Sequence, residues 1–369
     1  MEKTRFFVDC HVFDGNFQGT TTYIKGLYSE LIKDEKHHFF FGASNIEFLK
    51  SVFGTHENLT YVKYRSKNKF HRLLFDIPNI IKKNKIDYAH FQYVIPPIKK
   101  CKYIVTVHDV LFLDFPQYFP LLYRLKNKFL FKISAKYSDV VLTVSEYSKE
   151  QIQEHFKIEK VSVTNNAVDP IFFESYNKQE VKELVADRFK ITNYFIYVSR
   201  WEPRKNHHNL LKVFVEKEYY HNYSLVFIGD KAINNSYYMS YYSSLPEHIK
   251  AKIFEFNKVN FEDLLLFVRG ADLSIYPSIA EGFGIPPLES LAAEIPTICS
   301  NTTAMEDFYF LKELQFNPLM EKEIFDKIQL ALLDNNWSKR TIEMKEKYNW
   351  HQAKIDFIKA ISEHEKIEQ

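Results

Sequence analysis

The sequence predicts an α/β protein of two domains, each built around a parallel sheet. Short apolar runs alternate with helical patterns through the first part of the chain, as in successive βαβ units. After a polar run at 174–180, which we expect to be the linker, a new strand beginning at Tyr194 starts the same alternation again. With 369 residues, the chain is long enough for two sizeable cores. We therefore expect two Rossmann-like domains, with the change of domain after residue 172.

Composition and charge are those of an ordinary soluble protein. Hydrophobic residues make up 46% of the chain and charged residues 26%, and the net charge of +2 argues against a dedicated nucleic-acid binder. The three cysteines, Cys10, Cys101 and Cys299, are far apart, which favours a reducing cytoplasm over a disulfide framework or a zinc site. The N-terminus lacks the apolar core of a signal peptide, and no segment has the pattern of a transmembrane helix.

The first strand is expected at 6–9, and a polar loop at 14–23 precedes an amphipathic helix that runs through Ile32. A glycine-containing loop between strand and helix is where an α/β fold brings backbone amides to a phosphate. The loop lacks the spacing of a dinucleotide fingerprint. A simple turn is therefore the alternative interpretation.

Two buried parallel strands follow at 87–92 and 103–107, and the second ends in His108-Asp109. Ligands of open α/β sheets bind beyond the carboxyl ends of the strands, which is where His108 is placed. An imidazole there can donate to a developing charge or to a sugar hydroxyl. The alternative is a histidine with a structural role.

The segment 120–137 has apolar residues at helical spacing, five lysines and arginines, and no acidic residue. Such a helix can rest on an anionic membrane surface, where each nearby cation contributes about 1 kcal/mol. It can equally pack its apolar stripe into the core and leave a solvated basic face. The stripe consists of Leu122, Leu125, Phe129 and Ile133.

A strand at 139–144 runs into a helix with Ser145 as a plausible N-cap. In the second domain, Arg200 and Lys205 lie at the end of the strand that begins at Tyr194 and at the start of the next helix. Two cations and free N–H groups at such a place can clamp a diphosphate. Solvated surface charges are the alternative.

The stretch 278–294 carries the most specific pattern in the chain. It follows a strand at 272–276 and precedes a helix that opens at Pro286-Pro287, because prolines suit the first turn of a helix. This places Glu281 in the loop and Glu289 in the first helical turn. Glycines between them let the backbone approach a ligand with its amides and the positive end of the helix dipole.

The chain has only nine glycines, and two of them, Gly282 and Gly284, flank Phe283. Amides that bind anions, with a carboxylate at each end to accept from hydroxyls, indicate a site for a ligand that is both a phosphate and a polyol. An ordinary turn between a strand and a helix, with glutamate as a partner of the helix dipole, is the alternative.

The run 281–289, Glu-Gly-Phe-Gly-Ile-Pro-Pro-Leu-Glu, resembles the Glu-x7-Glu signature of the retaining glycosyltransferases with two facing Rossmann-like domains, the GT-B architecture of glycosyltransferase family 4. The resemblance extends over nearly the full length. Further similar segments are 106–116 around His108, 139–149, 163–170, the pair Arg200 and Lys205 as Arg-x4-Lys, and Gly19 with Tyr23. The chain departs from the family pattern at Thr20 to Thr22, Ala167 and Ser199.

The resemblance implies that the two domains face each other across a cleft. The C-terminal domain would bind the donor nucleotide and the N-terminal domain would bind the acceptor. The resemblance also implies that a C-terminal helix from Trp350 crosses back, so that 350–369 completes the first domain (1–172) and 173–349 forms the second. Catalytic roles would fall to His108 near the anomeric carbon and to Glu281 on the donor sugar. Donor binding would involve Gly19, Arg200, Lys205, Gly282, Phe283, Gly284 and Glu289, and backbone near Val259 would meet the nucleobase.

The implied function is retaining transfer of a hexosyl unit, such as mannose, glucose or GlcNAc, from a nucleotide-sugar to a hydroxyl of a glycan or lipid-linked glycan in bacterial surface polysaccharide synthesis. No Asp-x-Asp occurs, so we expect neither a metal nor another cofactor. We expect a cytoplasmic enzyme with peripheral contact to the inner face of the plasma membrane through 120–137, and no nucleic-acid partner. The alternatives are a non-catalytic nucleotide-sugar-binding subunit and a phosphorylase or epimerase of the same fold; an RNA-binding protein is disfavoured.

Overall fold

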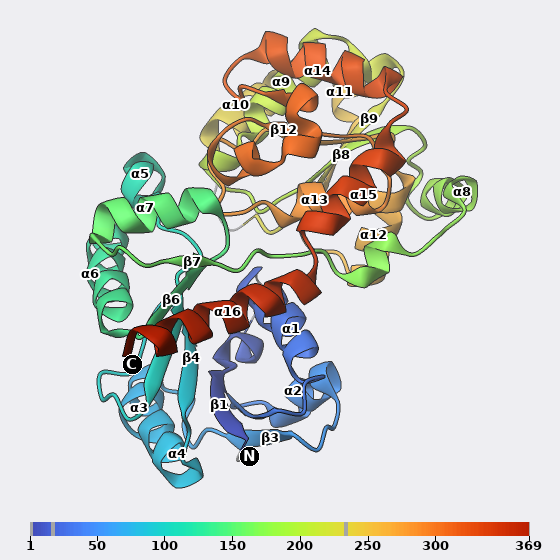
Figure 1. Cartoon of the computed structure of the whole chain (residues 1–369). Helices are drawn as coiled ribbons and strands as arrows, with labels where there is room; N and C mark the ends of the chain where they lie inside the picture. The colour runs from blue at the N-terminus through green and yellow to red at the C-terminus, as the bar shows by residue number, and fades with distance from the viewer. Residues whose placement is uncertain (1–2, 16–18, 232–234, 369) are drawn as a thin grey trace. The chain divides into compact units, whose positions relative to one another are not determined.

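The computed structural model describes residues 3–15, 19–231 and 235–368 (Figure 1). The chain forms two compact units, Met1–Ala167 with Tyr348–Gln369, and Val168–Lys347. The first boundary lies slightly before the predicted one because the 3-10 helix η4 (Pro170–Phe173) packs on the second unit. Its Phe172 ring contacts Phe261, with centroids 6.0 Å apart, and Arg269 donates to the carbonyl oxygen of Ile171 at 2.6 Å.

The first unit is built on a seven-stranded sheet in the order β3-β2-β1-β4-β5-β6-β7, and all of its neighbouring strands are parallel. This order places the carboxyl ends of β4 and β5 side by side. The strands are β1 (Thr4–Asp9), β2 (His37–Ala43), β3 (Leu59–Lys63), β4 (Tyr88–Gln92), β5 (Lys102–Thr106), β6 (Val140–Thr143) and β7 (Ser162–Val163).

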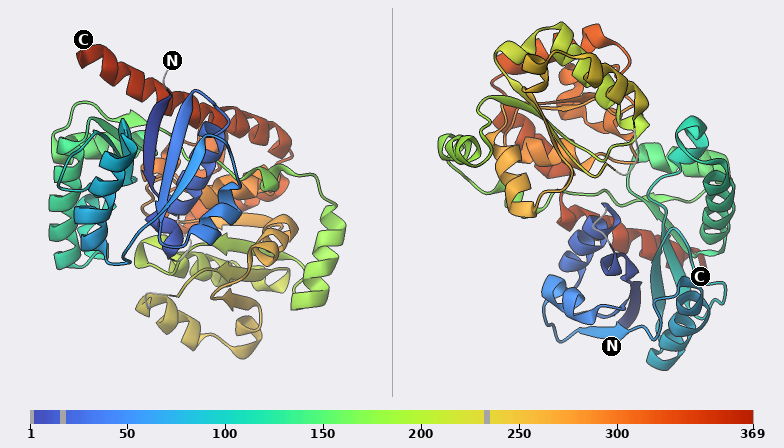
Figure 2. Two further views of the ribbon diagram at one scale, coloured as in Figure 1. Left: turned by 90° about the horizontal axis from the view of Figure 1, so that it is seen from below. Right: turned by 180° about the vertical axis from the view of Figure 1, so that it is seen from behind.

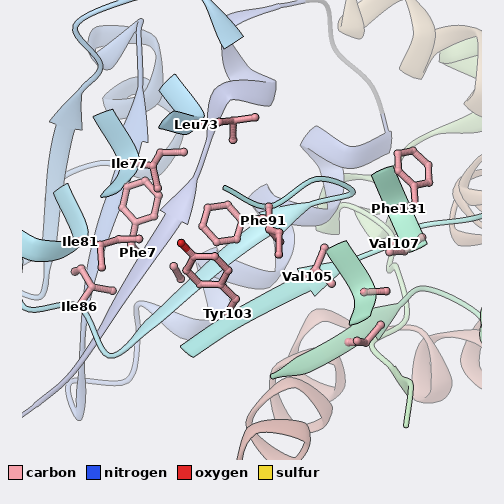
Figure 3. Packing of buried hydrophobic residues seen from close by; sticks show 14 of the residues in the cluster. Phe7, Leu73, Ile77, Ile81, Ile86, Phe91, Tyr103, Val105, Val107 and Phe131 are labelled. Carbon is pink, nitrogen blue, oxygen red and sulfur yellow. The ribbon is translucent and has the colours of Figure 1, made fainter. Parts of the chain in front are cut away.

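Helices cover both faces of this sheet, and Figure 3 shows one layer of the core between sheet and helices. In that layer Phe7, Phe91 and Tyr103 pack with Ile77 and Ile81, all of them buried. The helices are α1 (Gly19–Leu31), α2 (Ile46–Phe53), α3 (Lys69–His71), the π-helix η2 (Arg72–Asp76), α4 (Ile77–Asn84), α5 (Leu111–Asp114), α6 (Leu121–Tyr137), α7 (Glu146–Phe156) and α16 (Trp350–Glu368), with the 3-10 turns η1 (His11–Asp14) and η3 (Pro116–Tyr118).

The C-terminal helix α16 packs against α1 in the first unit, as the resemblance implied. A glycine in α1 makes this approach possible. A Cβ atom at Gly26 would lie only 2.0 Å from the indole ring of Trp350. Residues from both ends of the chain therefore close the first unit.

Most of the apolar stripe predicted on α6 faces solvent, which contradicts one of the two interpretations of the sequence. Its core side is formed by Phe131, Ser134 and Ala135, whereas Leu122, Leu125 and Phe129 of the predicted stripe are exposed. The core-packing interpretation of that stripe is therefore wrong. No helix in the described ranges is both long enough and apolar enough to span a bilayer.

The second unit has a six-stranded parallel sheet in the order β10-β9-β8-β11-β12-β13. Its strands are β8 (Tyr194–Val198), β9 (Ser224–Ile228), β10 (Ile253–Phe256), β11 (Leu273–Tyr276), β12 (Thr297–Ser300) and β13 (Gln315–Phe316). Its helices are α8 (Lys178–Phe189), α9 (His207–Glu216), α10 (Ser236–Ser244), α11 (Glu247–Lys250), α12 (Phe261–Gly270), α13 (Ile285–Ala292), α14 (Glu321–Leu333) and α15 (Trp337–Lys347). Short 3-10 turns are η5 (Pro203–Lys205), η6 (Tyr219–His221), η7 (Thr303–Asp307) and η8 (Tyr309–Leu314).

The polar run 174–180 is not wholly a linker, because α8 begins within it. The side chain of Asn177 accepts from the amides of Gln179 and Glu180 and caps the helix. Polar composition alone did not distinguish a capped helix start from a linker. Each unit is thus a doubly wound parallel sheet, which Figure 2 presents from two further sides.

Candidate functional site

The loop between β11 and α13 is held in place by the two neighbouring segments of the second unit. The amide of Ile279 donates to the carbonyl oxygen of Arg204 at 2.7 Å, and the hydroxyl of Thr302 donates to the carbonyl oxygen of Ile279 at 2.9 Å. The amide of Glu281 donates to the hydroxyl of Thr303 at 2.9 Å. Because β8 and β11 are neighbours in the sheet, the turn after β8 and this loop meet at the carboxyl edge.

Gly284 is the residue that turns the loop into α13. Its φ is 96°, in the left-handed region that suits glycine, and a Cβ atom there would lie 2.9 Å from Cγ of Met305. The buried ring of Phe283 packs on Phe308 at 6.0 Å, and Gly282 lies beside it in the loop. The backbone conformation of this turn therefore depends on glycine.

Helix α13 begins at Ile285, one residue before the predicted prolines. Pro286 and Pro287 occupy its second and third positions, so Glu289 lies just beyond the first turn, where we had placed it within that turn. The sequence pattern located the helix correctly, but proline tolerance extends over the whole first turn and does not fix its first residue.

Two cations from η5 meet the carboxylate of Glu281. Lys205 Nζ donates to Oε1 of Glu281, and Nη1 of Arg204 lies 3.4 Å from its Oε2. Arg204 also donates to the carbonyl oxygen of Ala280 at 2.5 Å and pairs with Glu202 at 2.7 Å. The side chains of Arg204, Lys205 and Glu281 are each less than one fifth exposed. The cluster is a compact group of alternating charges at the carboxyl ends of β8 and β11.

Of the two cations predicted as a clamp, Lys205 lies in this cluster and Arg200 does not. The side chain of Arg200 is more than half exposed, and its nearest carboxylate is Glu202 at 3.5 Å. Arg204, which the sequence reasoning did not single out, takes the inner position. Its only sequence signal was its place beside Lys205 in the short turn that Pro203 opens.

Charge pairing sets the ionisation of Glu281. Burial alone would raise the pKa of Glu281, but the positive charges of Lys205 and Arg204 and the hydrogen bond from Lys205 outweigh it, so the pKa lies below its ordinary value. Glu281 is therefore a carboxylate at neutral pH.

Glu289 differs from Glu281 in having no partner. Its half-buried carboxyl group makes no hydrogen bond or ion pair with the residues that the structure describes. Burial and the negative charge of Asp169 raise its pKa to about 7. A carboxyl group with a shifted pKa and no internal partner is a candidate for contact with a ligand. Val259 lies in the loop between β10 and α12, also at the carboxyl edge of the second sheet.

In the first unit, His108 follows β5 and is buried between two aromatic rings. The centroid of Tyr23 lies 5.1 Å from that of His108 and the centroid of Tyr93 lies 5.3 Å from it. The hydroxyl groups of Tyr23 and Thr164 lie 2.5 Å apart and hold Tyr23 in the core. Burial lowers the pKa of His108 to about 3, so the imidazole is neutral at physiological pH.

Gln92 determines which nitrogen of His108 carries the proton. The amide oxygen of Gln92 lies 2.6 Å from Nε2 of His108, and its amide nitrogen lies 3.2 Å from Nε2 of His90. Because a carbonyl oxygen only accepts, His108 donates from Nε2 and leaves Nδ1 unprotonated. His108 is 7% exposed, and within the described residues Nδ1 makes no hydrogen bond. In this tautomer Nδ1 is an acceptor, and Nε2, the donor, is occupied by Gln92.

Gly19 is the first residue of α1 and is exposed, and a Cβ atom there would meet nothing within 4 Å. Its backbone is therefore accessible, although the position does not require glycine for packing. Residues 16–18 of the same predicted loop lie outside the described residues.

Family models match almost the whole chain in two parts. Residues 179–348 match the model of glycosyl transferases group 1, and residues 17–172 match that of glycosyltransferase family 4. The two matches cover both units, including the Lys205–Glu281 cluster in one and His108 in the other.

Relatives and solved structures agree with these matches. An O-antigen chain mannosyltransferase of Salmonella typhimurium is 31% identical over 59% of this chain and 57% of its own length. O-antigen chain mannosyltransferase B of Escherichia coli is 25% identical over 74% of each chain. The crystal structure of Anabaena Alr3699/HepE in complex with UDP and glucose superposes with a TM-score of 0.70 over 98% of this chain and 100% of that one, at 13% identity, which shows a shared fold.

Proposed function

Because the chain belongs to the group 1 glycosyltransferases of family 4, we propose that it transfers a hexosyl unit from a nucleotide-sugar to a hydroxyl of a glycan or lipid-linked glycan. The observation that carries the proposal is the pairing of Lys205 and Arg204 with Glu281 beside the glycine loop that opens α13. The O-antigen mannosyltransferases among its relatives support a role in surface polysaccharide synthesis.

The charge cluster suits a ligand that brings both a diphosphate and a sugar. In the proposed complex, the diphosphate takes over the positive charge of Lys205, assisted by exposed Arg200 and the amides at the start of α13. This exchange releases the carboxylate of Glu281 from Lys205, so that it accepts from hydroxyls of the donor sugar. The diphosphate and the sugar of the donor thus bind the two members of one preformed ion pair.

Glu289 is assigned to the ribose of the donor. The support is its lack of an internal partner and its position on α13, two turns or fewer from the glycine loop. A carboxyl group there can accept from the two ribose hydroxyls. Backbone near Val259 remains the proposed contact of the nucleobase.

The transfer is proposed to retain the anomeric configuration and to need no metal. Side-chain cations stabilise the charge that develops on the leaving diphosphate, which is the largest contribution that such sites usually make. A phosphate oxygen of the donor accepts the proton of the attacking hydroxyl, and Nδ1 of neutral His108 accepts from a hydroxyl and orients it. No covalent intermediate on the protein is required by this scheme.

We further propose that the protein works in the cytoplasm at the inner face of the plasma membrane, in contact through 120–137. The support is that Leu122, Leu125 and Phe129 of the α6 stripe are exposed on a helix that also carries Arg124 and four lysines.

The direct test is to follow donor consumption and product formation by NMR, with a panel of UDP-, GDP-, ADP- and dTDP-sugars and a glycan acceptor, in the presence of EDTA. We expect transfer with one donor, retention in the product, and loss of turnover in Glu281→Gln. Glu247→Gln, an exposed glutamate on α11, is the matched control and should turn over normally. An inverted product contradicts retention, and a requirement for Mn²⁺ or Mg²⁺ contradicts metal independence.

The same experiment separates the other functions. Donor conversion without acceptor indicates an epimerase, and conversion that requires inorganic phosphate indicates a phosphorylase. Donor binding without turnover of any acceptor indicates a non-catalytic subunit.

A further inference from the structure

Two segments of the first unit, 58–75 and 115–138, contain no aspartate or glutamate. The first contains β3, α3, the loop between them and η2 up to Phe75, and the second forms α6 and the turn that leads into it. Figures 1 and 2 show α3 and α6 on the same side of the first unit. Partial burial and the nearby positive charges of Arg72 and Lys126 lower the pKa of Lys69, which places the α3 and α6 charges within electrostatic reach of each other.

Both segments expose large apolar side chains. Leu122 on α6 is 82% exposed and Phe70 on α3 is 74% exposed. Leu125 and Phe129 on α6 and Phe75 on η2 are each more than half exposed. Single exposed apolar residues are common on proteins, but five on three elements at one side of the unit form a patch of the kind that marks an interaction site.

Most cations of these segments have no ion-pair partner. Arg72 pairs with Asp9, but outside β3 eight lysines and arginines have no such partner within the described part of the chain, whereas several other helices carry lysines paired with a carboxylate one turn away. Unrelieved repulsion among like charges is unfavourable for folding, so a partner of opposite charge is the natural explanation. The eight are Arg65, Lys67, Lys69, Arg124, Lys126, Lys128, Lys132 and Lys136.

The combination of charge and apolar side chains selects one kind of partner. Branched aliphatic groups such as Leu122 and Leu125 match acyl chains and do not stack on nucleobases. A second copy of this surface would bring cations against cations. An anionic bilayer supplies both negative headgroups and an apolar interior, and it attracts basic amphipathic elements of this kind.

We propose that α3, η2 and α6 form one docking surface for an anionic lipid bilayer, with Phe70 and Phe75 entering the bilayer beside Leu122, Leu125 and Phe129. The second element deepens the proposed function, because it adds to the contact through 120–137 a second anchor that the sequence did not indicate. Two anchors on one rigid unit fix the rotation of that unit on the membrane, which a single helix does not.

The test is co-sedimentation of the full-length protein with vesicles of phosphatidylcholine alone and vesicles of equal parts phosphatidylcholine and phosphatidylglycerol. The variants are Phe70→Ser/Phe75→Ser, Leu122→Ser/Phe129→Ser, and the control Leu333→Ser/Ile342→Ser on exposed sites of the second unit. We expect at least tenfold tighter binding to the anionic vesicles. Each of the first two variants should bind at least tenfold more weakly, and the control should bind like the wild type.

Four outcomes overturn the proposal. An unchanged Phe70→Ser/Phe75→Ser variant reduces the surface to α6 alone. Equal binding to neutral and anionic vesicles would show that anionic lipid is not required. Dimers in light scattering that the same variants abolish assign the surface to a second copy, and displacement of the vesicles by RNA assigns it to a nucleic acid.

Saturation-transfer NMR on the same preparations separates this proposal from the proposed function. All variants should retain donor binding, since none of the substituted residues lies in the donor site. Vesicle binding without donor binding in the wild type would leave the docking surface standing and overturn the glycosyltransferase.

Discussion

Replacing Gly26 by alanine tests how the C-terminal helix supports the site of the first unit. Gly26 on α1 lies directly under Trp350 of α16, and a Cβ atom there would be 2.0, 2.3 and 2.4 Å from three carbons of the indole. The ring of Trp350 also contacts Tyr23, at 6.4 Å between centroids, and Tyr23 in turn packs on His108. A displaced Trp350 therefore disturbs the surroundings of His108.

The expected magnitude follows from these distances. Carbon atoms in contact lie about 3.5–4.0 Å apart, so the indole has to retreat by about 1.5 Å or more. Overpacking of this kind costs about 3 kcal/mol, at the upper end of the usual range. Alanine in place of glycine within a helix stabilises the folded state by about 1 kcal/mol through its higher helix propensity. We expect Gly26→Ala to lower the free energy of unfolding of the first unit by about 2 kcal/mol.

In a double-mutant cycle with Trp350→Ala, the effect of Gly26→Ala on the free energy of unfolding should change sign. Trp350→Ala alone should cost about 3–5 kcal/mol, because it removes a buried tryptophan. Without the indole, Gly26→Ala should stabilise the first unit by about 1 kcal/mol, since only helix propensity remains. The assay is urea unfolding by circular dichroism, with hydrogen exchange of the α1 amides to assign the transition to the first unit. If Gly26→Ala also stabilises the wild type, α16 does not pack on α1 as described.

Three further predictions concern the site residues. Gly284→Ala should abolish donor binding in NMR and lower the melting temperature of the second unit, because φ is 96° and the Cβ atom would press on Met305. Glu289 has its pKa raised from 4.5 to about 7, so the folded state holds a proton that the unfolded state releases between these values. The stability of the second unit should therefore fall as pH rises from about 4.5 to 7, and Glu289→Gln should remove this slope in urea titrations. In ¹⁵N NMR, His108 should be protonated at Nε2 in the wild type, a mixture of tautomers in Gln92→Leu, and again Nε2-protonated in Gln92→Glu.

Each of these has a clear contrary result. Glu247→Gln, at an exposed position of the same unit, is the control for Gly284→Ala, and equal donor binding in both variants would remove the glycine loop from the site. A pH slope that persists in Glu289→Gln belongs to another group. A wild-type His108 protonated at Nδ1 would mean that the amide of Gln92 is reversed and that His108 donates.

The α/β architecture was predictable because its signals are local. Strand and helix periodicity follow from neighbouring residues, and the glycines and prolines of 281–289 locate the turn before α13 within one residue. The loop and the cation segment could be placed together because parallel strands bring their carboxyl ends to one edge.

What the sequence did not reveal depends on contacts between distant segments. Periodicity marked an apolar stripe on α6, but only the packing of Phe131 and Ala135 shows that the stripe faces outward. Arg204 lies beside Glu281 because its guanidinium donates to the carbonyl oxygen of Ala280, a contact between distant segments that no local pattern indicates. The role of Gln92 likewise depends on two adjacent strands, β4 and β5.

The central claim is that the Lys205–Glu281 cluster binds a nucleotide-sugar. Saturation-transfer NMR of the wild type, Lys205→Ala and Arg200→Ala against the panel of UDP-, GDP-, ADP- and dTDP-sugars tests it most directly. We predict that the wild type binds one donor, that Lys205→Ala loses it, and that exposed Arg200→Ala weakens it less. Binding of the same donor by the wild type and by Lys205→Ala with equal strength would contradict the claim.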